Sequence, residues 1–141
     1  MSVSPDIQQT FDYLFGLAEK ALAEGRSFAP FATGALVGGG RTHSTADLNV
    51  AASTPQEHMV ALIDELRQQA ATGSIKSAGL AFDTVAPFDD GKASDAVCVH
   101  AETLAGEAVQ IFVPYERGRS VVPTFAEPVL QNVPARIFPA R

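Results

Sequence analysis

Apolar residues recur at helical spacing in two segments of the chain. The first segment, residues 5–24, carries an apolar stripe at every third or fourth position. Its members are Ile7, Phe11, Leu14, Ala18, Ala21 and Leu22. Ser4-Pro5-Asp6 has the form of an N-cap, a first-turn proline and an acid that suits a helix N-terminus. The pattern predicts a helix that ends near Gly25.

The second stripe follows Thr54-Pro55-Gln56-Glu57, which has the form of a capping box: a threonine cap with a glutamate three residues later. Its members are Met59, Val60, Ile63, Leu66 and Ala70. Gly73 is the predicted end of this helix. His58 in its first turn and His43 before it are expected to be solvated.

Other segments have the composition of strands. Phe28–Val37 is a predicted strand with an edge or bulge at Pro30, because proline cannot donate to a ladder. Gly38-Gly39-Gly40 then forms a turn into a weaker strand, Thr42–Ala51, and Lys76–Ala86 is a further strand.

Prolines dominate the C-terminal part of the chain. The last 26 residues hold four of the nine prolines, at 123, 128, 134 and 139. We expect mostly extended chain there, with a short strand around Ala135–Phe138.

Residues 96–115 form the most informative pattern, a predicted β-hairpin. Ala96–Leu104 and Ala108–Tyr115 are rich in β-branched and aromatic residues and flank Ala105-Gly106-Glu107. A three-residue loop with Gly106 at positive φ sets Leu104 opposite Ala108. It also pairs two apolar sets, Thr103, Ala101, Val99 and Val97 with Val109, Ile111, Val113 and Tyr115. One face of the hairpin is then almost wholly apolar.

The opposite hairpin face collects the unusual side chains of the chain: Cys98, His100, Glu102, Gln110 and Phe112. His100 and Glu102 project about 7 Å apart, near enough for the carboxylate to orient the imidazole. One interpretation is the solvated side of an antiparallel sheet. Another is a catalytic site with His100 as general base and Glu102 as its orienting group.

In the catalytic interpretation Cys98 or Asp95 assists His100, and these two residues with Gln110 and Phe112 are the candidate binding residues. A cation held by His100, Glu102 and a loop aspartate is a further hypothesis. The aspartates at 83, 89, 90 and 95 do not have the spacing of a calcium loop, so we predict no metal site and no cofactor.

Composition limits the classes of partner. The 141 residues suit a single domain, residues 1–141, and the lone cysteine excludes an intrachain disulfide, which favours a reducing cytoplasm. A net charge of −6 without a basic cluster argues against nucleic acid. No segment has about 18 uninterrupted apolar residues, so no membrane span is predicted. Apolar residues make up 46% of the chain and charged residues 18%, so apolar surface is expected to remain for a second subunit, and we predict a homodimer. The sequence does not identify a small-molecule ligand.

Two early motifs look like those of the cytidine deaminase family: Ala29-Pro30-Phe31 and Asn49-Val50, and His100-Ala101-Glu102 copies its zinc triplet. That family places the triplet at the start of a helix and completes the metal site with two cysteines. Here the triplet lies on a predicted strand and the chain has one cysteine. Deaminase chemistry is therefore excluded by the number of zinc ligands.

A broader resemblance covers most of the chain. It consists of Phe28-Ala29-Pro30-Phe31-Ala32, residues 91–96, residues 106–115 and Arg136-Ile137-Phe138. These segments resemble a family of small uncharacterised bacterial proteins. The resemblance implies a shared α+β fold and supplies neither an activity nor catalytic residues.

Together the patterns predict an α+β fold, an antiparallel sheet of about five strands flanked by two amphipathic helices. The order α-β-β-α-β-β-β is similar to that of profilin-like or roadblock-like domains. We expect both helices to pack on the apolar hairpin face. The function hypotheses are a non-catalytic binding or assembly module that acts through an exposed sheet face or edge strand, and alternatively a small hydrolase or isomerase.

Overall fold

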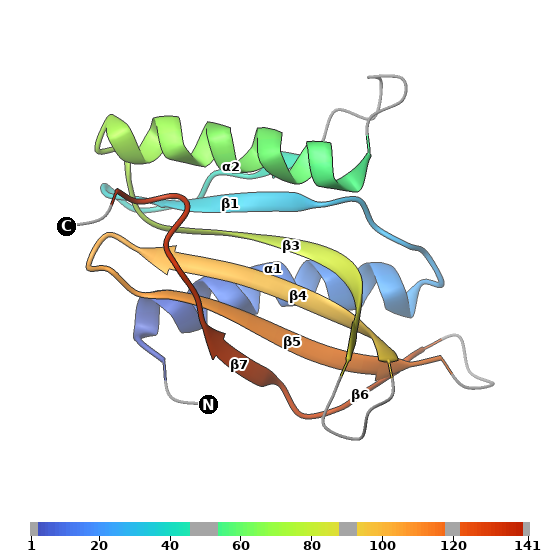
Figure 1. Ribbon diagram of the computed structural model, residues 1–141. Helices are drawn as coiled ribbons and strands as arrows, with labels where there is room; N and C mark the ends of the chain where they lie inside the picture. Colours follow the sequence, from blue (N-terminus) through green and yellow to red (C-terminus); the bar gives the residue numbers. More distant parts are fainter. Residues whose placement is uncertain (1–2, 46–53, 88–92, 118–121, 140–141) are drawn as a thin grey trace.

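The computed structural model describes residues 3–45, 54–87, 93–117 and 122–139. Two helices and an antiparallel sheet make up this part of the chain (Figure 1). The helices are α1 (Pro5–Ala23) and α2 (Pro55–Ala71). The strands are β1 (Phe31–Leu36), β2 (Ser44–Thr45), β3 (Ile75–Pro87), β4 (Ala93–Thr103), β5 (Ala108–Glu116), β6 (Thr124–Phe125) and β7 (Val129–Asn132). The predicted α+β class is confirmed, with two more strands than the five expected.

Both helices begin at the predicted caps. The Ser4 hydroxyl accepts the backbone N–H of Ile7 at 3.3 Å, and the Thr54 hydroxyl accepts that of Glu57 at 3.2 Å. Gly25 and Gly73 follow the two helices at a φ of 75°, a conformation that glycine adopts without steric cost. Local capping chemistry therefore sets the helix ends.

The strand order in the sheet is β2-β1-β3-β4-β5-β6, and β7 pairs with the segment of β5 that precedes the β6 contact. All pairs are antiparallel. The long strands β3 and β4 pair over eleven residues each and form the centre of the sheet. Strands β2 and β7 are short edge strands.

Helix α1 packs on the face of the sheet that carries the apolar side of the hairpin. The buried cluster there joins residues of α1 with odd-numbered residues of β3, β4 and β5. It comprises Ile7, Phe11, Leu14, Ala18, Leu22, Phe31, Ala81, Val97, Val99, Ala101, Val109, Ile111, Val113 and Tyr115. This half of the core agrees with the prediction from alternation along the strands.

Helix α2 packs on the opposite face, so the expectation that both helices share one face was wrong. Its cluster joins α2 with residues of β1 and β3 and with the C-terminal segment: Ala32, Leu62, Leu66, Ile75, Ala78, Leu80, Ile137 and Phe138. The reason is that β3 is buried on both faces, since Ala81 faces α1 whereas Leu80 faces α2. Val60, placed in the stripe, is 60% exposed, and Leu62 takes its place in the core.

The hairpin has the predicted loop length at a different position. Thr103 N–H donates to the Glu107 carbonyl at 3.0 Å, which makes Leu104–Gly106 the three-residue loop, with Gly106 at a φ of 109°. Ala101 therefore faces Val109 and not Ile111. The register differs from the prediction by two residues, and a shift of two leaves every side chain on its predicted face.

The C-terminal part differs most from expectation. The segment Ala135–Phe138 is not a strand and carries only bends, whereas Val129–Asn132 pairs with β5. In the predicted strand Thr42–Ala51, only Ser44–Thr45 is paired, and residues 46–51 lie outside the described residues, as do Asp89 and Asp90. Among the described residues, no helix has the length and apolar character needed to cross a bilayer.

Candidate functional site

Side-chain alternation places the five candidate residues of the hairpin on the α2 face of the sheet. His100 of β4 pairs with Gln110 of β5, and Cys98 pairs with Phe112. Glu102 follows on the same side of β4. These five residues are therefore neighbours, as the sequence pattern predicts.

This face is not solvated at His100 and Glu102, so that interpretation was wrong. His100 is 2% exposed and Glu102 is fully buried. The C-terminal segment covers them, because after β7 the chain crosses the sheet towards α2 (Figure 1). Ile137 and Phe138 of this segment then pack with Leu62 and Leu66 of α2.

The Glu102 carboxylate is the anchor of the C-terminal segment. Its Oε2 accepts the backbone N–H of Arg136 at 2.8 Å. The N–H of Ile137 lies 3.0 Å from Oε1, and that of Phe138 lies 3.2 Å from the same oxygen. Three consecutive amides thus surround one buried carboxylate, an arrangement that holds an anion with partial positive charges.

His100 completes the set of partners of this carboxylate. Its Nε2 lies 2.5 Å from Glu102 Oε2. Desolvation by burial raises the pKa of Glu102, but the hydrogen bonds from His100, Arg136 and Ile137 outweigh it, and the pKa lies below its ordinary value. The carboxylate is therefore held ionised inside the protein.

The second imidazole nitrogen of His100 faces β5. Gln110 Nε2 lies 3.5 Å from His100 Nδ1. A histidine between a carboxylate and an amide has the orientation of a general base. His100 is almost fully enclosed, so a substrate would have access to it only if the C-terminal segment moved away.

The two assisting residues do not complete a catalytic set. Cys98 is fully buried, and desolvation raises the pKa of its thiol to about 12, which leaves little of the nucleophilic thiolate near neutral pH. Asp95 is exposed and has the parity of Val97, so it projects from the α1 face. The prediction that Asp95 accompanies His100 was wrong, because side chains alternate along β4 and these two residues project from opposite faces of the sheet.

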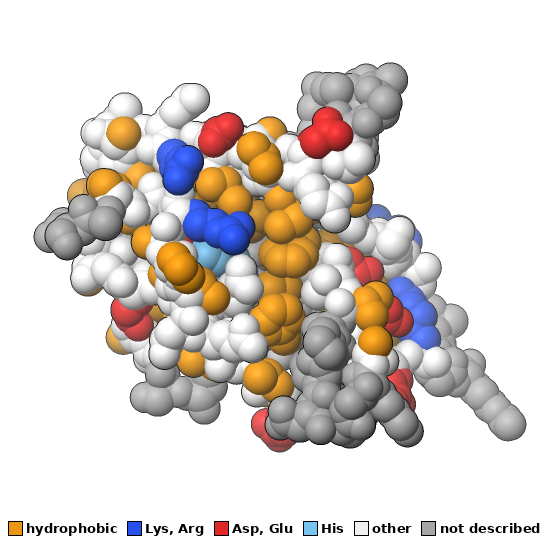
Figure 2. All heavy atoms as spheres, in the orientation of Figure 1, with side chains coloured by type: hydrophobic (Ala, Val, Ile, Leu, Met, Phe, Trp, Pro, Cys, Tyr) orange, Lys and Arg blue, Asp and Glu red, His pale blue; other side chains and the backbone are white. Residues whose placement is uncertain are grey.

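Apolar side chains continue across the α2 face next to His100. Phe82, Cys98, Phe112 and Val129 are paired in turn on β3, β4, β5 and β7, and we refer to these four residues as the apolar row. Phe82 and Phe112 are half-buried and Val129 is 42% exposed. Figure 2 shows hydrophobic side chains gathered in a strip below α2 on this face.

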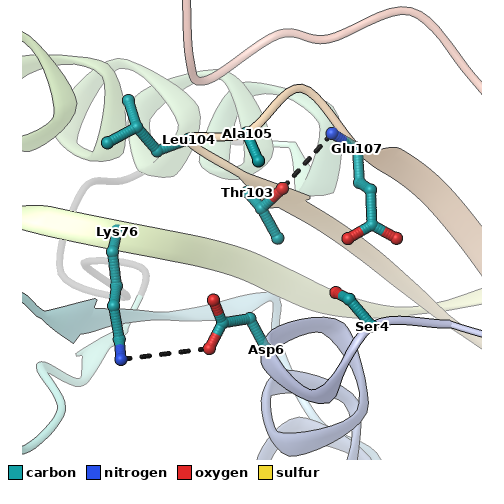
Figure 3. A pocket seen from close by; sticks show the side chains of 7 residues that line it. All are labelled: Ser4, Asp6, Lys76, Thr103, Leu104, Ala105 and Glu107. Atoms are coloured by element: carbon teal, nitrogen blue, oxygen red, sulfur yellow. Dashed lines mark hydrogen bonds and ion pairs between the residues drawn. The ribbon is translucent and has the colours of Figure 1, made fainter.

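A separate open pocket lies at the loop end of the hairpin, beside the start of α1. Its volume is about 400 Å³, and Asp6, Lys76, Thr103 and Glu107 are among its lining residues. Figure 3 shows the Glu107 carboxylate on the side of Ser4 and the Asp6 carboxylate on the side of Lys76, whose Nζ lies 3.9 Å from Asp6 Oδ1. The Thr103 hydroxyl is already used, because it accepts the Glu107 N–H at 3.2 Å. None of the predicted site residues lines this pocket.

Among the described residues, no group of three or more histidine, cysteine, aspartate or glutamate side chains is placed to hold a metal ion. His43 and His58 do not join His100. The Tyr13 hydroxyl and His43 Nδ1 are 3.0 Å apart on the α1 side, whereas His58 is half-buried on α2.

Sequence reasoning missed the C-terminal contribution to the site. The residues concerned are Arg136, Ile137 and Phe138, which act on Glu102 through backbone amides that no side-chain pattern encodes. The one signal in the sequence is the adjacent apolar pair Ile137-Phe138 between Pro134 and Pro139, which the pattern predicts as part of a strand.

Comparison with known proteins gave no match to a family model, to a curated protein or to a solved structure. The resemblance to small uncharacterised bacterial proteins therefore stays a prediction.

Proposed function

We propose that this protein is a non-catalytic assembly module that binds another polypeptide through the apolar row and the adjoining edge strand β7. The observation that carries the proposal is the partial exposure of the row. Phe82 and Phe112 are half-buried and Val129 is 42% exposed, whereas Leu80, His100 and Glu102 on the same sheet face are buried. A half-covered apolar surface next to a free edge strand is a common recognition site for peptides and subunits.

The charge of the protein supports a polypeptide partner. A net charge of −6 opposes contact with a phosphate backbone or an anionic membrane surface. The single, fully buried cysteine suits a reducing cytoplasm, which we propose as its location.

The 2.5 Å contact of His100 with Glu102 favours a second candidate, a small hydrolase or isomerase. Against it, the same carboxylate already accepts three backbone amides, and the pair is buried. The geometry of the His100–Glu102 pair is explained by its role in holding the C-terminal segment, so the catalytic function is the second candidate.

Replacing one residue of the apolar row with lysine tests the proposal. We expect Val129→Lys to weaken association at least tenfold, because Val129 is the member of the row on β7 and a charge in the interface must lose its water. Val85→Lys is the matched control, since Val85 is also an exposed valine, at 64%, but projects from the α1 face of β3. Sedimentation over a concentration series measures self-association, and cross-linking in native lysate captures other partners.

A wild-type protein that stays monomeric at every concentration and is cross-linked to no other polypeptide would exclude the assembly function. Equal loss of association in Val129→Lys and Val85→Lys would exclude the α2 face as the surface used.

A further inference from the structure

We infer that the polypeptide partner is a second copy of this chain, bound by antiparallel pairing of β7 with β7 of the partner subunit around a two-fold axis at Gln131. The inference rests on the proposed assembly function and specifies its partner and its register. It follows from the hydrogen-bond directions along β7, from the neutrality of that strand and from the prolines at its ends.

The first step is the direction of the backbone groups of β7. Val133 N–H donates to the Ala108 carbonyl at 3.0 Å, so this pair is hydrogen-bonded. Hydrogen-bonded and non-bonded pairs alternate in an antiparallel ladder, so Gln131 and Val129 also bond to β5. The N–H and C=O groups of Leu130 and Asn132 therefore point away from β5, at the free edge.

The second step is that β7 has no charge or bulge along its free edge. Edge strands of monomeric proteins are protected by charges, bulges, prolines, short length or a covering element, and β7 has only its short length and its flanking prolines. Val129–Asn132 has no charged residue, and all four of its residues pair with β5 in an unbroken register. Among the described residues no strand other than β5 pairs with β7.

The third step is self-complementarity. Leu130 and Asn132 lie symmetrically about Gln131, so a two-fold axis there pairs Leu130 with Asn132 of the partner subunit and Asn132 with Leu130 of the partner subunit. Each pair exchanges two hydrogen bonds, which satisfies all four outward groups on each copy. Pro128 and Pro134 bracket the strand and have no N–H, so the ladder ends where β7 ends.

The side chains agree with this register. Val129, Gln131 and Val133 share the α2 face with Phe112, since Val129 pairs with Phe112. Across the axis Val129 lies beside Val133 of the partner subunit, so the apolar row continues into the second copy. Gln131 faces Gln131 of the partner subunit at a non-bonded position, where Cα atoms are about 4.5 Å apart and neutral amides do not repel.

The experiment uses Gln131, which is exposed and lies on the proposed two-fold axis. We expect Gln131→Lys and Gln131→Glu each to be monomeric by sedimentation, because like charges lie directly opposite one another. An equimolar mixture of the two variants should regain the dimer. Gln68→Lys, on the exposed face of α2, is the matched control and should dimerise like the wild type.

Gln131→Cys tests the register itself. A Cα separation of about 4.5 Å is within the range of a disulfide, so mild oxidation should produce a covalent dimer. Wild-type protein is the control, since its single Cys98 is fully buried. Failure of Gln131→Cys to cross-link while the wild type dimerises would overturn the register.

The outcomes separate this inference from the proposed function. If Gln131→Lys still dimerises while Val129→Lys does not, the two-fold axis at Gln131 is wrong and assembly through the apolar row stands. If the wild type is monomeric yet captures another polypeptide that Val129→Lys loses, a second copy is excluded as the partner and the assembly function stands. Recovery of the dimer in the mixture of Gln131→Lys and Gln131→Glu supports the two-fold axis at Gln131.

Discussion

At the scale of single residues, Glu102 does more than any other polar side chain to organise the α2 face. It is fully buried and accepts hydrogen bonds from His100 and from three successive backbone amides. A buried carboxylate is tolerable only when its oxygens are satisfied, and here each oxygen has more than one donor. The histidine and glutamate that resemble a catalytic pair in sequence therefore have a structural task.

Replacing Glu102 with leucine should be strongly destabilising. The substitution leaves the amides of Arg136, Ile137 and Phe138 without an acceptor, and we expect the free energy of unfolding to fall by about 3 to 5 kcal/mol. Urea denaturation measures the loss, and hydrogen exchange should show faster exchange at these three amides. Glu116→Leu, at an exposed position at the end of β5, should change stability by less than about 0.5 kcal/mol. Unchanged protection of the three amides would contradict the role of Glu102.

Glu102 also predicts a dependence of stability on pH. Its folded pKa is depressed below the ordinary value of 4.5, so the unfolded state binds the proton more readily. The stabilisation is fully present above pH 4.5 and is lost as the pH falls through the folded pKa. The difference in unfolding free energy between wild type and Glu102→Gln should thus be constant near neutral pH and shrink in acid. A difference that grows in acid would reverse the assigned direction.

At the scale of elements, β3 is the central strand that both layers share. Gly79 lies where α1 crosses β3, and a Cβ there would come within 2.5 Å of the His100 carbonyl oxygen and 2.9 Å of Thr10 Cγ2. The close approach of helix and sheet therefore requires the absence of a side chain at this position.

Gly79→Ala tests this packing against a glycine in an open position. We expect Gly79→Ala to destabilise the protein by about 1 to 3 kcal/mol, because the backbone must shift to accept the methyl group. Gly16→Ala, in α1 with nothing within 4 Å of its Cβ, should instead stabilise by about 0.5 to 1 kcal/mol. Thermal unfolding followed by circular dichroism measures both. A neutral Gly79→Ala would show that α1 is not held this closely.

At the scale of the whole molecule, two apolar clusters share one sheet. Leu14 belongs to the α1 cluster and Leu66 to the α2 cluster, and both are fully buried. Neither layer has a sheet of its own, since β3 supplies side chains to both. Loss of either layer therefore exposes one face of the shared strand β3.

We expect the two layers to unfold together. Leu14→Ala and Leu66→Ala should each lower the free energy of unfolding by about 2 to 5 kcal/mol, because each leaves a cavity in a packed cluster. Each variant should still show a single transition with the same denaturant slope. Leu17→Ala, at a position 39% exposed, is the control and should cost far less. Two separate transitions would show that the layers are independent.

The sequence by itself determined the helix ends, the strands β3 to β5 and the faces of the hairpin, because caps, glycines and period-two alternation act within a few residues. It also brought Cys98, His100, Glu102, Gln110 and Phe112 to one face.

Only the tertiary structure decided which face each helix covers and what covers His100 and Glu102. A stripe on a helix specifies burial but not the surface it meets, and β3 is apolar on both sides. The bonds to Glu102 come from backbone amides 34 to 36 residues further along the chain. Backbone donors are the same for every residue except proline, so no residue pattern could reveal this contact.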